Sequence, residues 1–133
     1  MRFPSLDEVI ACNEAVREPH EASPSADDDD LDLVSHALER ARTETDPVDA
    51  AVALLYEIAA AQGFFEDKKR TAVLIARWFI RANTTIDPDR LVGPDDHRLG
   101  ALLIRTARGD RNRGVILALL RERAGEGSLD GLS

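Results

Sequence analysis

Two long apolar segments near the middle of the chain constrain its fold most strongly. Residues 48–61 and 68–82 are rich in alanine and large aliphatic side chains, and the apolar positions recur at helical spacing in both. A helix that is apolar over most of its surface has to be buried, so we expect these two helices to form the centre of the domain. They are joined through a charged stretch, QGFFEDKKRT, at residues 62–71.

The remaining helices have recognisable start signals. Ser5 and Glu8 form a capping-box pattern before a helix that ends near Arg17, and Asp46-Pro47 gives an N-cap acid followed by proline. No strand pattern appears beyond a short extended piece around residues 42–45. We therefore expect an all-α domain of about six helices around the two apolar ones, with room for a short flap. The other expected helices cover residues 31–42, a short turn after 87, residues 94–107 and a last segment through 115–120 that fades at Gly125.

Length and composition fit one domain without a nucleic-acid or membrane role. The chain has 133 residues, and we expect residues 1–124 to fold together, with 18–30 as an exposed acidic loop and 125–133 as a flexible tail. A formal charge of −8 argues against non-specific binding to nucleic acid or anionic membranes. The single cysteine, Cys12, allows no intrachain disulfide, and the N-terminal residues lack the apolar core of a signal peptide. We therefore expect a cytoplasmic protein; its oligomeric state is not readable from the sequence.

The charged stretch between the apolar helices has the features of an anion site. A helix that begins near Lys68 leaves its first N–H groups unpaired at the positive end of the helix dipole. Lys68, Lys69 and Arg70 add side-chain cations, and Glu66 can hold a divalent metal that bridges phosphates. An ordinary solvated helix start explains the same residues. Bases in a first turn oppose the dipole, however, so a bound anion would relieve a local conflict.

The same stretch resembles the signature loop of the Fic/Doc (Fido) family in its death-on-curing branch. That signature reads His-x-Phe-x-Asp/Glu-x-Asn-Lys/Gly-Arg and is often followed by Thr. The opening FPSLDEVIACNEAV, the segment LDLVSHALERART and the closing LGALLIRTARGDRNRGVILALLRERA look like the family's first, second and last helices, so the resemblance covers nearly the whole chain. The motif positions are occupied in order by Gln62, Phe64, Glu66, Lys68, Lys69, Arg70 and Thr71.

The resemblance implies that the loop binds ATP and Mg²⁺ and transfers part of the nucleotide to a protein hydroxyl. Most Fido members transfer AMP, whereas Doc-type toxins transfer the terminal phosphate to a translation elongation factor and are countered by an antitoxin. By this resemblance Phe64 anchors the loop in the core, Glu66 holds Mg²⁺ on the phosphates, and Arg70 clamps phosphate oxygens. Further phosphate contacts come from Lys68, Lys69 and Thr71.

Two positions depart from the family motif. Gln62 replaces the histidine that takes the proton from the target hydroxyl, and losing base catalysis costs on the order of 10²–10⁴-fold in rate. Lys68 replaces the asparagine that helps to form the anion-binding nest. Any remaining catalysis would depend on positioning and charge supplied by Lys68, Lys69 and Arg70. Two classes of function stay open: a toxin-type transferase with an altered motif, and a degenerate Fido domain that is a pseudoenzyme or serves other chemistry, such as a biosynthetic pathway.

Three histidines are candidates to replace the missing base. His20 lies in the expected acidic loop, His36 in the second expected helix and His97 near a helix start. His36 is the most interesting, because in the family the second helix leads toward the flap over the active site. An ordinary surface position, or a half-buried position with its hydrogen bonds satisfied, explains each histidine better than a catalytic role, so none is assigned one.

Overall fold

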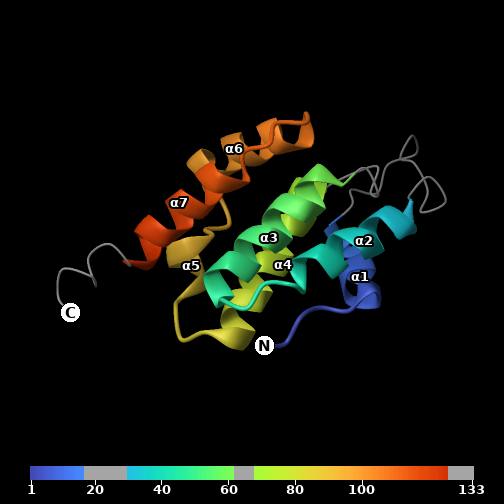
Figure 1. Ribbon diagram of the computed structural model, residues 1–133, viewed down its shortest axis with the longest axis horizontal. Coiled ribbons are helices and arrows are strands. Elements are labelled where there is room, and N and C mark those ends of the chain that lie inside the picture. Colours follow the sequence, from blue (N-terminus) through green and yellow to red (C-terminus); the bar gives the residue numbers. More distant parts are fainter. Residues whose placement is uncertain (17–29, 62–67, 126–133) are drawn as a thin grey trace.

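The chain folds into a bundle of helices (Figure 1). The computed structural model describes residues 1–16, 30–61 and 68–125, and these residues form seven helices and no strand. The all-α prediction is therefore confirmed for this part of the chain. The helix beyond the expected six is the short one at Pro88–Leu91, which is the single turn expected after residue 87. The helices are α1 (Leu6–Val16), α2 (Leu31–Ala41), α3 (Pro47–Ala60), α4 (Lys68–Asn83), α5 (Pro88–Leu91), α6 (His97–Ala107) and α7 (Arg113–Ala124).

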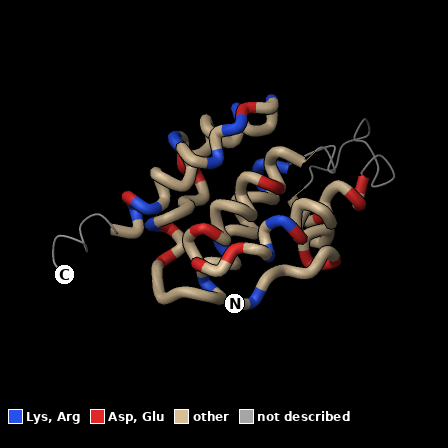
Figure 2. The backbone as a smooth tube through the Cα atoms, in the orientation of Figure 1, with Lys and Arg blue, Asp and Glu red and all other residues tan. Residues whose placement is uncertain are grey.

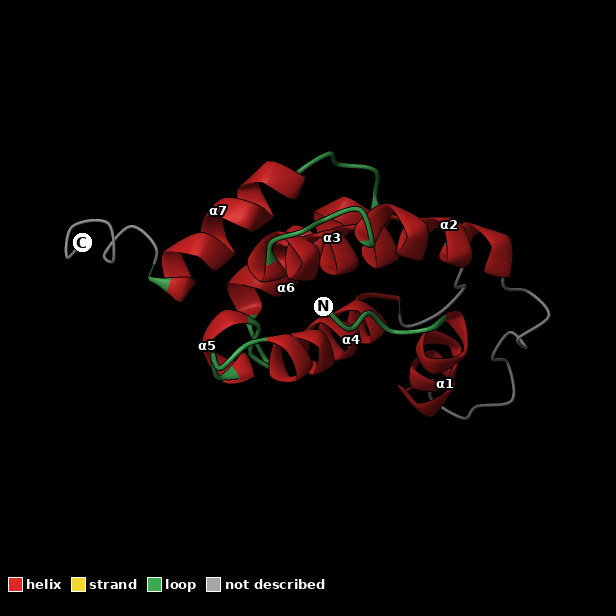
Figure 3. Cartoon of the chain, turned by 60° about the horizontal axis from the view of Figure 1, so that its bottom comes forward, coloured by secondary structure: helices red, strands yellow, loops and turns green. Residues whose placement is uncertain are grey.

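The two apolar segments pair at the centre of the bundle, as predicted. The contact between α3 and α4 is the most extensive of any helix pair in the described ranges. Helix α3 also packs against α2, α6 and α7, and α4 also packs against α1, α5 and α6 (Figures 1 and 3). Helix α3 is buried around most of its circumference, and its buried side chains include Leu54, Leu55 and Ile58. This helix is the core around which the others are arranged.

The helix starts that the sequence predicts at Ser5 and Asp46 are confirmed by their capping hydrogen bonds. The Ser5 hydroxyl accepts a hydrogen bond from the Glu8 N–H at 3.1 Å, and the Glu8 carboxylate accepts one from the Ser5 N–H at 3.0 Å. The Asp46 carboxylate accepts hydrogen bonds from the N–H groups of Val48 and Asp49 at 3.0 and 3.1 Å. These bonds satisfy backbone donors that the helix itself leaves unpaired, and they fix where α1 and α3 begin.

The expectation of an extended piece around residues 42–45 is wrong. After α2 the chain turns instead: the N–H of Thr43 bonds the carbonyl of Arg40 at 3.3 Å, and the N–H of Glu44 bonds the carbonyl of Ala41 at 3.2 Å. The last carbonyls of α2 need donors, and the residues that follow supply them in a tight turn. No strand-like flap therefore forms at this place, or elsewhere in the ranges that the structure describes.

The start of the sixth helix also differs from the expectation. It was expected at Pro94, but α6 begins at His97, because the Asp96 carboxylate accepts the Leu99 N–H at 3.0 Å and makes Asp96 the N-cap. The end of the last helix agrees with the sequence. Gly125 closes α7 in a left-handed conformation with φ of 77°, which glycine adopts without strain.

Several expectations concern residues outside the described ranges. Residues 18–29 of the expected acidic loop and residues 126–133 of the expected tail belong to this group. Asp30, at the edge of that loop, is described: its carboxylate accepts hydrogen bonds from the N–H groups of Asp32 and Leu33 and caps α2. Among the described helices, none has the length and apolarity that a membrane span requires.

Candidate functional site

The described part of the predicted anion loop is the first turn of α4. Lys68, Lys69 and Arg70 open this helix, and no acidic residue lies in its first turn. Three side-chain cations therefore sit at the positive end of the α4 helix dipole. The predictions for Gln62, Phe64 and Glu66 fall outside the described residues and stay predictions.

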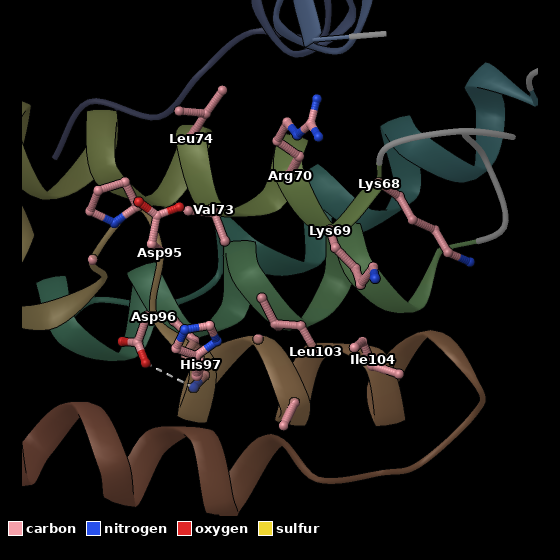
Figure 4. Close-up of a pocket in the computed structure, with 15 residues that line it drawn as sticks. Lys68, Lys69, Arg70, Val73, Leu74, Asp95, Asp96, His97, Leu103 and Ile104 are labelled. Carbon is pink, nitrogen blue, oxygen red and sulfur yellow. Dashed lines mark hydrogen bonds between the residues drawn. The ribbon is translucent and has the colours of Figure 1, made fainter. Parts of the chain in front are cut away.

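The first two turns of α4 line a cleft against α6 and the loop before it. This α4–α6 cleft encloses about 740 Å³, which lies within the rough range of 300–1,000 Å³ typical of small-molecule sites. Helices α4 and α6 run in opposite directions, so the start of α6 lies far from the start of α4 (Figure 4). Lys68 and Lys69 consequently line one end of the cleft, and Asp95, Asp96 and His97 line the other.

Apolar side chains lie between the two charged ends. Val73 comes from α4 and Leu103 and Ile104 from α6 (Figure 4), and Ile104 is 38% exposed. The cleft thus has a cationic end, an apolar middle and an acidic end. Such a surface suits a ligand with an anionic group, an apolar or aromatic body and a hydrogen-bond donor at its far end.

The two lysines occupy different positions at the cationic end. Figure 4 shows Lys69 directed across the cleft toward α6, and Lys68 directed outward at the mouth of the cleft. Burial lowers the pKa of the Lys68 ammonium, because partial loss of water disfavours the charged form. A bound anion would favour the charged form of this side chain.

Arg70 is directed toward α1 in the structure. Its guanidinium Nη1 donates a hydrogen bond of 3.0 Å to the carbonyl oxygen of Val16, the last residue of α1. Figure 4 shows the side chain on the opposite side of α4 from Lys69. Arg70 contributes to the wall of the cleft, but its charge is directed to the negative end of the α1 dipole.

Thr71 lies in the interior between α1 and α4. Its side chain is fully buried, and its Oγ1 accepts a hydrogen bond of 3.0 Å from Nδ2 of Asn13, which is also buried. The predicted phosphate contacts are therefore not all brought together. The structure places Lys68 and Lys69 along the cleft, turns Arg70 toward α1, and places the Thr71 hydroxyl in the core.

The acidic end of the cleft is held by α7. Burial opposes ionisation of Asp96, but hydrogen bonds from Arg123 and from the Leu99 N–H outweigh it and lower the pKa of the Asp96 carboxyl. Arg123 forms an ion pair with Asp96 and also donates a hydrogen bond of 3.0 Å to the carbonyl of Leu91. Asp96 is thereby fixed, and Asp95 is the more exposed carboxylate beside it.

Sequence reasoning did not assign this end of the site. The sequence pattern gives Asp95 no functional role and makes His97 only a candidate to replace the missing catalytic base. Of the two histidines that the structure describes, His97 lines the cleft and His36 is exposed on α2. The available signal was the acidic pair and histidine at a helix start, but nothing in the linear spacing relates that start to Lys69.

The described residues do not by themselves form a metal site. No group of three or more His, Cys, Asp or Glu side chains that could hold a metal ion occurs in residues 1–16, 30–61 and 68–125. Asp96 is already engaged by Arg123. A Mg²⁺ ion at the cationic end would therefore depend on Glu66 and on the oxygens of the phosphates themselves.

Comparison of the chain with protein-family models, with curated proteins and with solved structures finds no match.

Proposed function

We propose that this chain is a Fido-like domain that binds the phosphates of a nucleotide at the first turn of α4 and performs the family's transfer reaction poorly or not at all. One observation carries the proposal: the first turn of α4, within the described residues, has three consecutive cations and no acid, and it lines a cleft of about 740 Å³. Phosphate groups are anions that such a helix start attracts, through the positive end of the helix dipole and the side-chain cations together.

The rest of the nucleotide fits the remainder of the cleft. With its phosphates at Lys68 and Lys69, the sugar and base would extend between Val73 and Leu103. An amino group on the base would then meet the acidic end, where Asp95 is exposed. ATP has all three parts, with Mg²⁺ held by Glu66 and the phosphate oxygens, as the resemblance implies.

The chemistry of transfer would be impaired by Gln62. In AMP transfer a protein hydroxyl attacks the α-phosphorus and pyrophosphate leaves; in phosphate transfer it attacks the γ-phosphorus and ADP leaves. In both reactions the hydroxyl proton needs an acceptor, and an amide accepts none at neutral pH. The chain would therefore hold its nucleotide in place and transfer from it slowly, as a pseudoenzyme or a weakened toxin-type transferase.

Calorimetric titration with ATP and Mg²⁺ tests the binding. We expect saturable heat and an affinity about tenfold lower for Lys69→Ala, because a hydrogen bond to a charged group contributes about 1.5–3 kcal/mol. Arg111→Ala removes an exposed arginine outside the cleft and serves as the control. Absence of heat in the wild type would refute the proposal. Equal binding of inorganic triphosphate and ATP would reduce it to a simple anion site.

Incubation with α- and γ-labelled ATP in a cell lysate tests the chemistry. We expect little label on protein with the wild type and clear labelling with the double variant Gln62→His, Lys68→Asn, which restores the family residues. The position of the label decides between AMP and phosphate transfer. Strong labelling by the wild type would show a competent transferase and would contradict the assignment of impaired transfer.

A further inference from the structure

The arginines of the chain are most densely placed in the segment that runs from α6 to the end of α7. Residues 97–125 contain seven arginines, no lysine and only two acidic residues, a formal charge of +5 in a chain whose formal charge is −8. Figure 2 shows these basic positions along α6 and α7, while most acidic positions lie on other parts of the chain. One region of an acidic protein therefore carries a local field of opposite sign.

Some of these arginines are neutralised within the fold and some are not. Arg113, Arg121 and Arg123 form ion pairs with acids that lie outside α6 and α7, and Arg105 pairs with Asp110 at 3.0 Å. Arg98, Arg108 and Arg111 are exposed, and none of their side chains has a hydrogen bond or ion pair with a residue of the described ranges. Within the described ranges, positive charge is thus left without an ion pair at Arg98 on α6 and at Arg108 and Arg111 in the segment that follows α6.

Arg98 and Arg105 border a second cavity, on a different side of α6 from the α4–α6 cleft. This α6–α7 groove encloses about 370 Å³, and Glu122 lines it from α7. Val115 in its wall is 55% exposed, more than any other large apolar side chain in the described ranges. The remaining lining is apolar: Ala101, Leu102, Ala118 and Leu119.

We propose that the α6–α7 groove docks an acidic amphipathic helix of another protein. Arg98 and Arg105 lie two helical turns apart, a rise of about 10.5 Å along α6. An apposed helix with carboxylates seven residues apart would match this spacing: one carboxylate would pair with Arg98, and the other would take the place of Asp110 at Arg105. The apolar residues between them would cover Val115 and Leu119. Arginine suits this role better than lysine, because its planar guanidinium pairs with a carboxylate through two hydrogen bonds and arginine is common at protein interfaces.

The chemistry of the groove favours a protein helix over a nucleic acid. Most of its lining is apolar, which a phosphate backbone cannot use, and Glu122 would repel phosphate on the α7 side. The contact spans about two helical turns, so the interface belongs to the small, transient class below about 1,200 Å². The proposal does not depend on nucleotide binding, because only Ala101 is shared with the α4–α6 cleft.

Fluorescence anisotropy with two designed peptides tests the proposal on the full chain. Each peptide has about 18 residues, or five helical turns, with a leucine stripe flanked by glutamates in one and by lysines in the other. We expect the glutamate peptide to bind at least about tenfold more tightly than the lysine peptide, since each charge-assisted pair that forms adds to the affinity. Arg98→Glu with Arg105→Glu should reverse this preference. The control Arg108→Glu with Arg111→Glu makes the same charge change at exposed positions outside the groove and should leave the preference intact.

Other outcomes would overturn the proposal. These are failure of the glutamate peptide to bind, an equal loss of preference in both double variants, and tighter binding of a single-stranded RNA of similar charge. Sedimentation of the protein alone over a range of concentrations tests whether a second copy of this chain occupies the groove instead. A dimer that dissociates only in the Arg98→Glu, Arg105→Glu variant would assign the groove to a second copy of this chain.

Discussion

Arg70 and Val16 join the start of α4 to the end of α1. The hydrogen bond of 3.0 Å from the Arg70 guanidinium to the Val16 carbonyl places a cation at the negative end of the α1 dipole. Arg70 is also the residue that the family resemblance assigns to phosphate clamping. The two roles compete for one side chain, because a guanidinium that contacts α1 has to turn before it reaches a phosphate in the α4–α6 cleft.

Removal of this side chain should loosen the end of α1. We expect Arg70→Ala to speed amide hydrogen exchange in the last turn of α1 and to lower the free energy of unfolding by about 0.5–1.5 kcal/mol, the usual contribution of one hydrogen bond. Arg111→Ala, which removes an exposed arginine, should change neither quantity. If Arg70 also serves the nucleotide, ATP and Mg²⁺ should speed the same amides in the wild type. Unchanged exchange in Arg70→Ala would contradict the structural role.

Lys68 should oppose stability while it supports binding. Its ammonium lies at the positive end of α4, and burial lowers its pKa. We expect Lys68→Met to raise the free energy of unfolding in urea by about 0.3–1 kcal/mol, because an unfavourable interaction with the helix dipole is lost. The same variant should bind ATP more weakly. Arg81→Met, in the last turn of α4 where a cation is favourable, should lower stability. A loss of stability in Lys68→Met would argue against this account.

Asn13 and Thr71 should behave as a coupled pair. Both side chains are buried and share a hydrogen bond of 3.0 Å. We expect Thr71→Val to lower the free energy of unfolding by about 1–3 kcal/mol, because the Asn13 amide is left in the core without this acceptor. Asn13→Leu combined with Thr71→Val should cost less than the sum of the single changes, as measured by a double-mutant cycle in urea. Strict additivity would show that the bond has no energetic role.

Asp96 should make stability depend on pH in the acid range. Its folded pKa lies below the ordinary value of 3.8, so its contribution is fully present above that value and is lost as pH falls through the folded pKa. We expect Asp96→Asn to lower the free energy of unfolding at pH 7 by about 1–3 kcal/mol, because Arg123 loses its charged partner. The difference between variant and wild type should shrink as pH falls from about 3.8 through the folded pKa, and should then level off. A difference independent of pH would show that the capping hydrogen bond, and not the charge, is what matters.

The helices were predictable because their signals are local. Asp46-Pro47, the Ser5–Glu8 capping box and Gly125 each act over a few residues, and all three do in the fold what their sequence indicated. The prediction of an extended piece at 42–45 was wrong because a turn whose N–H groups bond the last carbonyls of α2 has no strong residue signature.

The site was less predictable because its parts meet only through helix packing. Successive residues of a helix point about 100° apart, so Lys68 to Thr71 span most of a full turn and cannot all face one ligand. Which of them faces α6 and which faces α1 is decided by how the helices cross, and the sequence of α4 does not contain that information. The same holds for Asp95 and His97, which line the end of the cleft opposite the lysines only because α6 packs against α4 in the opposite direction.

Ala101 lines both the α4–α6 cleft and the α6–α7 groove. A larger side chain at this one position would narrow both cavities at once. The two surfaces therefore cannot diversify independently during evolution: a substitution at Ala101 selected for a new occupant on one side of α6 also alters the other side.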